Sequence, residues 1–342
     1  MKIDYRSDTV TRPSTPMLDV MRYASVGDAV FGDDPSVLEL ESFAADMFGM
    51  DRGLFCPSGT MANQIAIKVH TKPGDQLICD QTAHVYFYEG GGAALHSGVT
   101  CRLLSGDGGR FQAAEVEAVI NDPEDTHFPR TRVVSIENTC NKGGGTCWDF
   151  REIERIGAVC KSHDLSLHLD GARLFHALIE TPESPADYGS LFDSISICLS
   201  KGLGAPMGSL LLGSEEFIHE ASRARKAFGG GMRQAGYMAA AGLFALQNNT
   251  RRLTIDHEKA RRLSEAFERS GLAGEVLPAV TNIVMFDFET PEALDAAKDR
   301  FAAADILVAA MGKKRLRLVT HLDITEEMID RTIKIIEGMG DD

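Results

Sequence analysis

Short apolar runs alternate with helix-like stretches between residues 50 and 212. The helix-like stretches at 113–120 and 150–161 repeat apolar positions every three or four residues, which is the spacing of an amphipathic helix. Apolar runs of strand length lie at 76–79, 100–104, 132–137, 165–169 and 194–199. Strands that alternate with helices are typical of an α/β domain, so this pattern predicts a largely parallel sheet covered by helices.

The pattern changes after three consecutive glycines. Residues 232–247 are rich in alanine and predict a buried helix, and residues 253–269 predict an amphipathic helix that ends at Gly271. The elements predicted after it are a strand at 282–288, a helix at 292–303, a strand at 316–320 and a helix at 326–339. We therefore expect two domains, a large one over residues 1–248 and a small α/β one over residues 249–342.

Composition and charge narrow the class of protein. The chain has 342 residues, of which 44% are apolar and 25% charged, an ordinary balance for a globular protein. Its 35 Lys and Arg residues against 50 Asp and Glu residues give a net charge of −15, which opposes binding to nucleic acid or to an anionic membrane surface. We expect a small-molecule partner, which can be anionic if it is held in a local basic pocket.

Cysteine usage and the first residues of the chain point to a reducing compartment. The seven cysteines are scattered and include no C-x-x-C pair, so neither a disulfide framework nor a bound metal is expected. The first residues are charged, and no uncharged stretch approaches the roughly 20 residues of a membrane-spanning helix. We therefore expect a soluble, cytoplasmic protein.

Lys201 stands at the most informative position of the chain. It follows the apolar run 194–199 and precedes a stretch of glycines and small residues. An amine that leaves water at the end of a strand is suited to attack a carbonyl and form a Schiff base, and its small neighbours leave room for a flat cofactor. The alternative is a lysine that ends a strand and extends its charge into solvent.

Asp170 and Arg173 lie where the run 165–169 ends and a helix is expected to begin. The carboxyl ends of strands in an open α/β sheet gather ligands, and a carboxylate there would keep a pyridine nitrogen protonated. Arg173 would reach an oxyanion close to the same ring. Asp170 would otherwise be a helix cap, which is the commoner role.

Ser58, Gly59 and Thr60 lie at the expected start of another helix. Free N–H groups, a permissive glycine and two hydroxyls converge there, which makes an anion site. An ordinary capping motif has the same kind of sequence, so both interpretations stay open.

Two histidines and two arginines complete the candidates. His84 follows a predicted strand, where its ring can stack on a planar cofactor, and His127 lies in a polar loop, where it can carry a proton. Arg233 and Arg317 are candidates to bind a carboxylate or a phosphate, because a guanidinium binds both groups with two donors. Arg317 would otherwise be the solvent-facing residue of an alternating strand.

Motifs along nearly the whole chain carry a resemblance to a known family. They are Tyr5-Arg-Ser-Asp-Thr-Val-Thr-Arg-Pro, Phe31-Gly-Asp-Asp-Pro, Pro57-Ser-Gly-Thr, Ala83-His, Glu89-Gly-Gly-Gly-Ala-Ala, Glu137-Asn-Thr, His168-Leu-Asp-Gly-Ala-Arg, Leu199-Ser-Lys-Gly-Leu-Gly, Gly229-Gly-Gly-Met-Arg-Gln and Arg317-Leu-Val-Thr-His-Leu-Asp. In this order they closely resemble the low-specificity L-threonine aldolases. Each motif alone is weak, but so many ordered matches make chance implausible.

The resemblance implies a fold, a cofactor and an assembly. The family belongs to the aspartate-aminotransferase-like enzymes of fold type I, which use pyridoxal 5′-phosphate (PLP). It therefore implies a large domain with a seven-stranded, mostly parallel sheet and a small carboxy-terminal domain. It also implies a homodimer or homotetramer whose subunits share active sites.

The resemblance also assigns roles by motif. Lys201 is similar to the lysine that forms the Schiff base with PLP, and Asp170 to the partner of the pyridine nitrogen. Arg173 resembles the residue near the phenolic oxygen of the ring and the substrate. The remaining matches are Ser58, Gly59 and Thr60 for the phosphate, His84 for stacking on the ring, Ser7 and Arg317 for the substrate carboxylate, and Arg233 for phosphate or carboxylate.

Two residues depart from the family pattern. Phe31 stands where a tyrosine is expected, and Cys140 stands where a histidine is expected. Both departures concern the pocket for the substrate side chain more than the cofactor.

The activity implied by the resemblance is retro-aldol cleavage of L-threonine, L-allo-threonine and other β-hydroxy-α-amino acids to glycine and an aldehyde. His84 or His127 would be the base, directly or through water. Two alternatives stay open. A β-eliminating lyase would release pyruvate and ammonia from an aromatic or sulfur-containing amino acid, and a non-catalytic PLP-binding protein would keep the fold without turnover.

Overall fold

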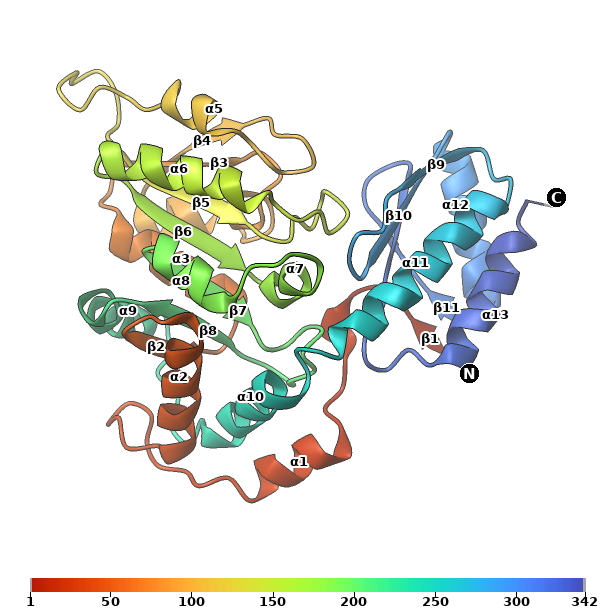
Figure 1. Ribbon diagram of the computed structural model, residues 1–342, viewed down its shortest axis with the longest axis horizontal. Helices are drawn as coiled ribbons and strands as arrows, with labels where there is room; N and C mark the ends of the chain where they lie inside the picture. The colour runs from red at the N-terminus through yellow and green to blue at the C-terminus, as the bar shows by residue number, and fades with distance from the viewer. Residues whose placement is uncertain (1, 341–342) are drawn as a thin grey trace.

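The computed structural model describes residues 2–340 of the chain. Two main hydrophobic cores divide these residues into a large unit, built on a seven-stranded sheet, and a small unit, built on a four-stranded sheet. In Figure 1 the small unit lies to the right of the large unit, and the long helix α11 (Leu253–Arg269) connects them. No helix in this described part is long and apolar enough to cross a membrane.

The sheet of the large unit has the strand order β2-β8-β7-β6-β5-β3-β4. Neighbouring strands from β7 to β4 run parallel, whereas β8 runs antiparallel to both β7 and β2. The bounds are β2 (Arg52–Cys56), β3 (Gln76–Asp80), β4 (Thr100–Leu104), β5 (Thr131–Glu137), β6 (Ser166–Gly171), β7 (Ser194–Cys198) and β8 (Ser209–Gly213). The mostly parallel, seven-stranded sheet implied by the resemblance is confirmed. Every residue of β3 and β7 is buried, which explains why the sequence carries apolar runs there.

Helices cover both faces of this sheet (Figure 1). Leu211 of β8 packs in the core under α3 (Gly59–His70) and α9 (Glu215–Ala227), whereas its neighbours Leu210 and Leu212 pack in the main core on the other face. This alternation is that of a strand buried on both sides. The other helices of the unit are α1 (Thr15–Arg22), α2 (Pro35–Phe48), α4 (His84–Phe87), α5 (Ala113–Glu117), α6 (Phe150–Ser162), α7 (Leu174–Glu180), α8 (Pro185–Leu191) and α10 (Gly236–Asn248).

Local sequence signals place several helix ends. Asp34 accepts a hydrogen bond from Val37 N–H and caps α2, which ends at Gly49 in the left-handed conformation, φ +63°. The predicted amphipathic helix at 253–269 matches α11, and Gly271 follows its last turn with φ +70°. The predicted buried helix at 232–247 begins later, because α10 starts only at Gly236.

The small unit contains an antiparallel sheet of order β12-β13-β10-β9. The two strands and two helices predicted after α11 are present as β10 (Ile283–Phe288), α12 (Pro291–Ala303), β13 (Arg315–Val319) and α13 (Glu326–Glu337), with shifts of one or two residues at their ends. Three short strands were not predicted: β9 (Gly274–Leu277), β11 (Ile306–Leu307) and β12 (Ala309–Ala310).

The amino-terminal strand packs in the small unit and not in the large one. β1 (Ile3–Asp4) pairs in parallel with β11, and Ile3 and Tyr5 lie in the small core. A division of the chain at residue 248 does not anticipate this return of the first residues. The next turn, η1 (Asp8–Val10), leads the chain back toward the large unit and brings Ser7 and Asp8 to the junction of the two units.

Candidate active site

The strands β3, β5, β6 and β7 are parallel neighbours, and the candidate residues lie at or after the carboxyl ends of three of them. Asp170 lies at the end of β6, Lys201 follows β7, and His84 opens α4 after β3. The charges of Asp170 and Lys201 both act on the pKa of His84, so both groups lie within electrostatic range of its ring. The structure therefore brings these three predicted site residues together at one edge of the sheet.

Asp170 is a buried carboxylate held by neutral donors. Its Oδ2 accepts a hydrogen bond from Asn63 Nδ2 at 2.8 Å, and its Oδ1 accepts one from Ala172 N–H at 3.1 Å. Helix α7 begins only at Leu174 and Arg173 is its cap position. Asp170 is thus not the cap of α7, and the interpretation of a simple helix cap is wrong.

His84 is oriented by two carboxylates. Its backbone N–H donates to Glu137 Oε2 at 2.7 Å, and its ring Nδ1 lies 2.8 Å from Glu89 Oε1. Since a carboxylate only accepts, Nδ1 carries the proton and Nε2 is left to face other partners. Burial lowers the pKa of His84, but the hydrogen bond to Glu89 and the charges of Asp170 and Glu89 outweigh it and raise the pKa above its ordinary value.

Glu89 and Glu137 are site residues to which the motifs gave no role. Glu89 accepts hydrogen bonds from Asn63 and Gln64 as well as contacting His84. Burial, with the charge of Asp170, raises the pKa of Glu137 to about 7. A charged residue at the end of a buried strand, as Glu137 is in β5, was the available signal in the sequence.

The predicted anion site lies at the start of α3. Ser58 is the cap, and its Oγ accepts a hydrogen bond from Met61 N–H at 3.2 Å. A Cβ on Gly59 would lie 2.6 Å from Cys198 Sγ at the end of β7, so only glycine lets the helix start approach the strand that leads to Lys201. The capping and anion-site interpretations are therefore compatible, because the first-turn N–H groups of a helix have no partner within it.

Arg173 is already engaged in a buried ion pair. Its Nε and Nη2 donate to the two oxygens of Asp8 at 2.8 and 2.7 Å, and both residues are enclosed. Burial raises the pKa of Asp8, but the charges of Arg173 and then Lys201 outweigh it and hold that pKa well below its usual range. Asp8 was not among the candidate residues, since it is separated from Arg173 by more than 160 positions.

Arg317 points into the junction of the two units. Its Nη1 donates to Asn141 Oδ1 at 2.8 Å and its Nη2 to the carbonyl of Arg6 at 2.8 Å, while its Nε is buried without a partner among the described residues. Burial and the charge of Arg173 lower the pKa of Arg317 to about 10. The alternative of a solvent-facing strand residue is wrong. The bond to Arg6 also places Arg317 next to the segment that contains Ser7, whose Oγ caps η1.

His127 and Arg233 do not join this cluster within the chain. His127 is 87% exposed, pairs with Asp125 at 2.8 Å and precedes β5, at the amino edge of the parallel sheet. Arg233 is 60% exposed and pairs with Asp28 at 2.9 Å. A role for either residue at Lys201 would have to come from a neighbouring copy of the chain.

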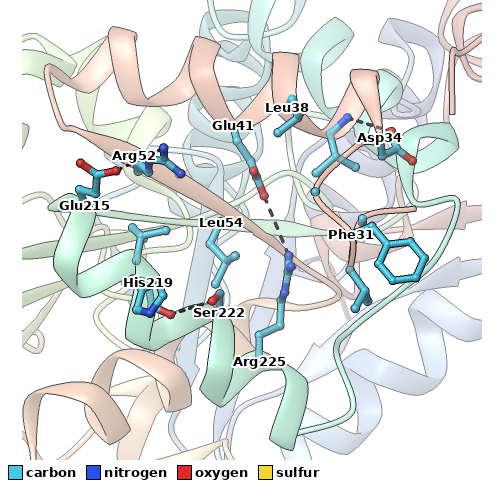
Figure 2. A pocket seen from close by; sticks show the side chains of 16 residues that line it. Phe31, Asp34, Leu38, Glu41, Arg52, Leu54, Glu215, His219, Ser222 and Arg225 are labelled. Atoms are coloured by element: carbon cyan, nitrogen blue, oxygen red, sulfur yellow. Dashed lines mark hydrogen bonds and ion pairs between the residues drawn. The ribbon is translucent and has the colours of Figure 1, made fainter. Parts of the chain in front are cut away.

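The two departures from the family pattern lie apart from each other. Phe31 is 78% exposed and stands at the edge of a cavity of about 350 Å³ lined also by Glu41 and Arg225 (Figure 2). Lys201 and Asp170 do not line this cavity. Cys140 is buried, and its Sγ contacts the carbonyl of Glu137 at 3.1 Å, so it supports the residue that positions His84.

The fold and the donor set define a class of protein. A lysine after a buried strand, a buried carboxylate at the next strand end, a histidine ring and a helix start meet at one edge of a mostly parallel sheet with a small unit beside it. This set suits a planar phosphate-bearing aldehyde, which needs an amine, a partner for its ring nitrogen and a phosphate cradle. The class is that of the fold type I pyridoxal-phosphate enzymes.

Comparisons with known proteins define the family. A model of the beta-eliminating lyase family matches residues 4–291. Low-specificity L-threonine aldolase 1 of Arabidopsis thaliana is 39% identical over 98% of this chain and 95% of its own length. The low specificity L-threonine aldolase of Saccharomyces cerevisiae is 40% identical over 96% of this chain and 84% of its own. The chain therefore belongs to the beta-eliminating lyase family and, within it, to the group of the low-specificity L-threonine aldolases.

Solved structures support the fold. The threonine aldolase of Leishmania major superposes with a TM-score of 0.86 at 22% identity and covers 99% of both chains. Serine palmitoyltransferase of Sphingomonas wittichii superposes with a TM-score of 0.76 at 14% identity and covers 99% of this chain and 87% of its own. At these identities the likeness concerns the fold alone.

Proposed function

We propose that this chain is a PLP-dependent lyase that cleaves L-threonine, L-allo-threonine and other β-hydroxy-α-amino acids to glycine and an aldehyde. The observation that carries the proposal is the convergence of Lys201, Asp170 and His84 at the carboxyl edge of the sheet. The names of the relatives in Arabidopsis and yeast support the same reaction.

The residues at this edge fit PLP. Lys201 would hold it as a Schiff base, Asp170 would face the ring nitrogen, and the helix start at Ser58, Gly59 and Thr60 would bind the phosphate. The absence of a Cβ at Gly59 supports this assignment, because it lets the helix start approach the end of β7. When bound, PLP supplies an electron sink for the negative charge left at Cα when the Cα–Cβ bond breaks.

Arg317 would bind the substrate carboxylate, with Ser7 beside it. Two nitrogens of Arg173, Nε and Nη2, already donate to Asp8. Arg317 instead has a buried Nε without a partner among residues 2–340 and shares its donors with neutral oxygens, so an arriving carboxylate would be its first anionic partner. A fixed carboxylate fixes in turn the direction of the Cα–Cβ bond, which decides the bond that breaks.

His84 would remove the proton from the β-hydroxyl. Its Nδ1–H is held by Glu89, which leaves the lone pair of Nε2 to accept that proton, directly or through a water. Glu89 then stabilises the positive charge that develops on the ring. Of the two histidines predicted as the base, His84 is the one that the geometry of a single chain supports.

The proposal includes a homodimer or homotetramer that shares its active sites. His127, Arg233 and Phe31 are exposed in the single chain, and Arg233 and Phe31 lie in motifs that resemble those of the family. Contact with a second copy would give them a place at the site. Sedimentation velocity measures this directly, and a monomer with full activity would contradict it.

β-Elimination is the second candidate activity, favoured by the description of the family model that the chain matches. The two reactions have different products. The purified, PLP-loaded protein would be incubated with L-threonine, L-allo-threonine and L-serine, and the products identified. Glycine with acetaldehyde from both threonine diastereomers supports the proposal, whereas pyruvate or 2-oxobutyrate with ammonia supports elimination.

Lys201→Ala is the matched control for this experiment. It should lose the visible band of the bound cofactor and the release of glycine together, because both need the same amine. A wild-type protein that takes up PLP, changes colour with threonine and releases no product would support the non-catalytic alternative.

A further inference from the structure

A buried chain of hydrogen bonds runs away from Asp170 through the interior of the large unit. Asn63 of α3 donates to Asp170, and its Oδ1 lies 3.2 Å from Nε2 of His168 on β6. His168 Nδ1 lies 2.8 Å from Ser194 Oγ, and Ser194 Oγ lies 2.7 Å from Nε2 of His70. These hydrogen bonds thus link the carboxyl end of β6 to Ser194, the first residue of β7, which lies at the amino ends of the parallel strands.

Asn63 joins two carboxylates of the site. Its Nδ2 donates to Asp170 Oδ2 at 2.8 Å and to Glu89 Oε1 at 2.9 Å, so both of its amide hydrogens are used. Its Oδ1 accepts from Ser196 Oγ at 2.6 Å as well as from His168. A reversed amide would set its oxygen against two negative charges, so the surroundings permit one orientation.

The two histidines in this chain of hydrogen bonds, His168 and His70, are neutral, and each has one tautomer. Burial lowers the pKa of His168 to about 4 and that of His70 to about 3. His168 must donate from Nε2, because Asn63 Oδ1 only accepts, and its Nδ1 therefore accepts from the Ser194 hydroxyl. Ser194 Oγ then accepts from His70 Nε2, so every donor in the chain points toward the carboxylates.

We propose that Asn63 is a positioning residue that couples the carboxylate facing the cofactor ring, Asp170, to the carboxylate that orients the base, Glu89. The neutral chain of His168, Ser194 and His70 fixes the direction of its amide. This inference rests on the proposed function, because the roles of Asp170 and His84 come from it.

The physical reason is the closeness of the two negative charges. His84, Glu89 and Asp170 have polar atoms that lie within 4.8 Å of one another. Two carboxylates this close favour uptake of a proton by one of them unless a shared donor separates them. The titratable groups around the pair are His84 of α4, Glu137 of β5, His168 of β6 and Lys201 after β7, and none of these donates to both carboxylates within the described residues.

The test compares two isosteric substitutions on the same helix. Asn63→Leu removes the donor to both carboxylates, whereas Gln64→Met removes a donor to Glu89 alone. Two readouts separate them in the PLP-loaded protein. The pH titration of the visible band reports the charge opposite the ring nitrogen, and the NMR titration of the His84 ring responds to its hydrogen bond with Glu89 as well as to the charge of Asp170.

Asn63→Leu should move both titrations, and the midpoint of the visible band should rise by about one pH unit, the size expected when a hydrogen bond to a charged group is lost. Gln64→Met should move the His84 titration alone. If Asn63→Leu does not fold, Asn63→Ser replaces it. With a single hydroxyl donor, it should move one of the two readouts.

The outcomes distinguish the two proposals. A folded Asn63→Leu protein in which neither titration moves, or in which only the His84 titration moves as in Gln64→Met, would overturn the coupling while leaving the aldolase activity in place. A wild-type protein that binds PLP but releases no glycine would overturn the proposed function, and the spectroscopic comparison would still decide the role of Asn63.

Discussion

The buried ion pair between Asp8 and Arg173 predicts a large loss of stability when one charge is removed. Asp8→Asn keeps the size of the side chain but leaves the enclosed guanidinium of Arg173 without a negative partner. Breaking a buried pair in this way costs about 3–5 kcal/mol, and each kcal/mol corresponds to roughly 2–4 °C in melting temperature for large domains. We therefore expect Asp8→Asn to lower the melting temperature by at least about 6 °C.

The pH dependence of this loss follows from the direction of the pKa shift. The pKa of Asp8 lies below its ordinary value, because the charge of Arg173 outweighs burial. A carboxyl group of this kind adds stability above its unfolded pKa, near 4, and loses that stability as the pH falls through its folded pKa. The difference between wild type and Asp8→Asn should therefore be complete at neutral pH and should shrink in acid.

Thermal unfolding followed by circular dichroism across this pH range measures the effect. Asp295→Asn is the matched control, because it removes the same charge from the exposed pair with Lys298, where solvent screening leaves little to lose. Equal melting temperatures for the two variants would refute the reasoning. So would a difference that stays constant down to the lowest pH at which the protein remains folded.

Three further predictions concern the site. Arg317→Gln should lower kcat/KM for L-threonine by about 100-fold, mostly through KM, because the substrate carboxylate loses its charged partner; steady-state kinetics measures this. Glu89→Gln should lower the pKa of His84, whose pKa Glu89 raises, and so shift the acid limb of the pH–rate profile to lower pH; an unmoved limb would contradict His84 as the base. Gly59→Ala should weaken PLP binding about tenfold or more, because its Cβ would lie 2.6 Å from Cys198 Sγ; a fluorescence titration with PLP tests it.

The fold was predictable where local patterns are strong. The amphipathic run and Gly271 set the bounds of α11, and the apolar runs located the parallel strands to within one or two residues. β1 and β11 escaped prediction because each has two residues, too few for an alternating pattern. The packing of Ile3 and Tyr5 in the small core follows from that pairing and so could not be predicted either.

The site was predictable in part, for a different reason. Lys201, Asp170 and His84 lie next to strand ends, so a local signal marks each of them. Asp8 and Asn63 carry no such signal, because their partners Arg173 and Asp170 are more than 100 residues away. The alternating pattern of β13 did not predict whether the side chain of Arg317 faces solvent or the interior. The structure shows that it is largely buried.

The distribution of charge at this edge of the sheet explains how the site can receive the carboxylate of an amino-acid substrate. Amide N–H groups donate to Asp170, Glu89 and Glu137, and Glu89 also contacts the ring of His84. Among the described residues these carboxylates do not pair with the ammonium or guanidinium groups nearby. Lys201 forms no ion pair within residues 2–340, and Arg317 donates only to neutral oxygens. If these carboxylates formed ion pairs with Lys201 and Arg317, both ion pairs would have to break before the substrate could bind. Because amide groups hold the carboxylates, Lys201 and Arg317 both stay available to the ligand. The amide of Asn63 is therefore as necessary to the site as the charges of Asp170 and Glu89, which it separates.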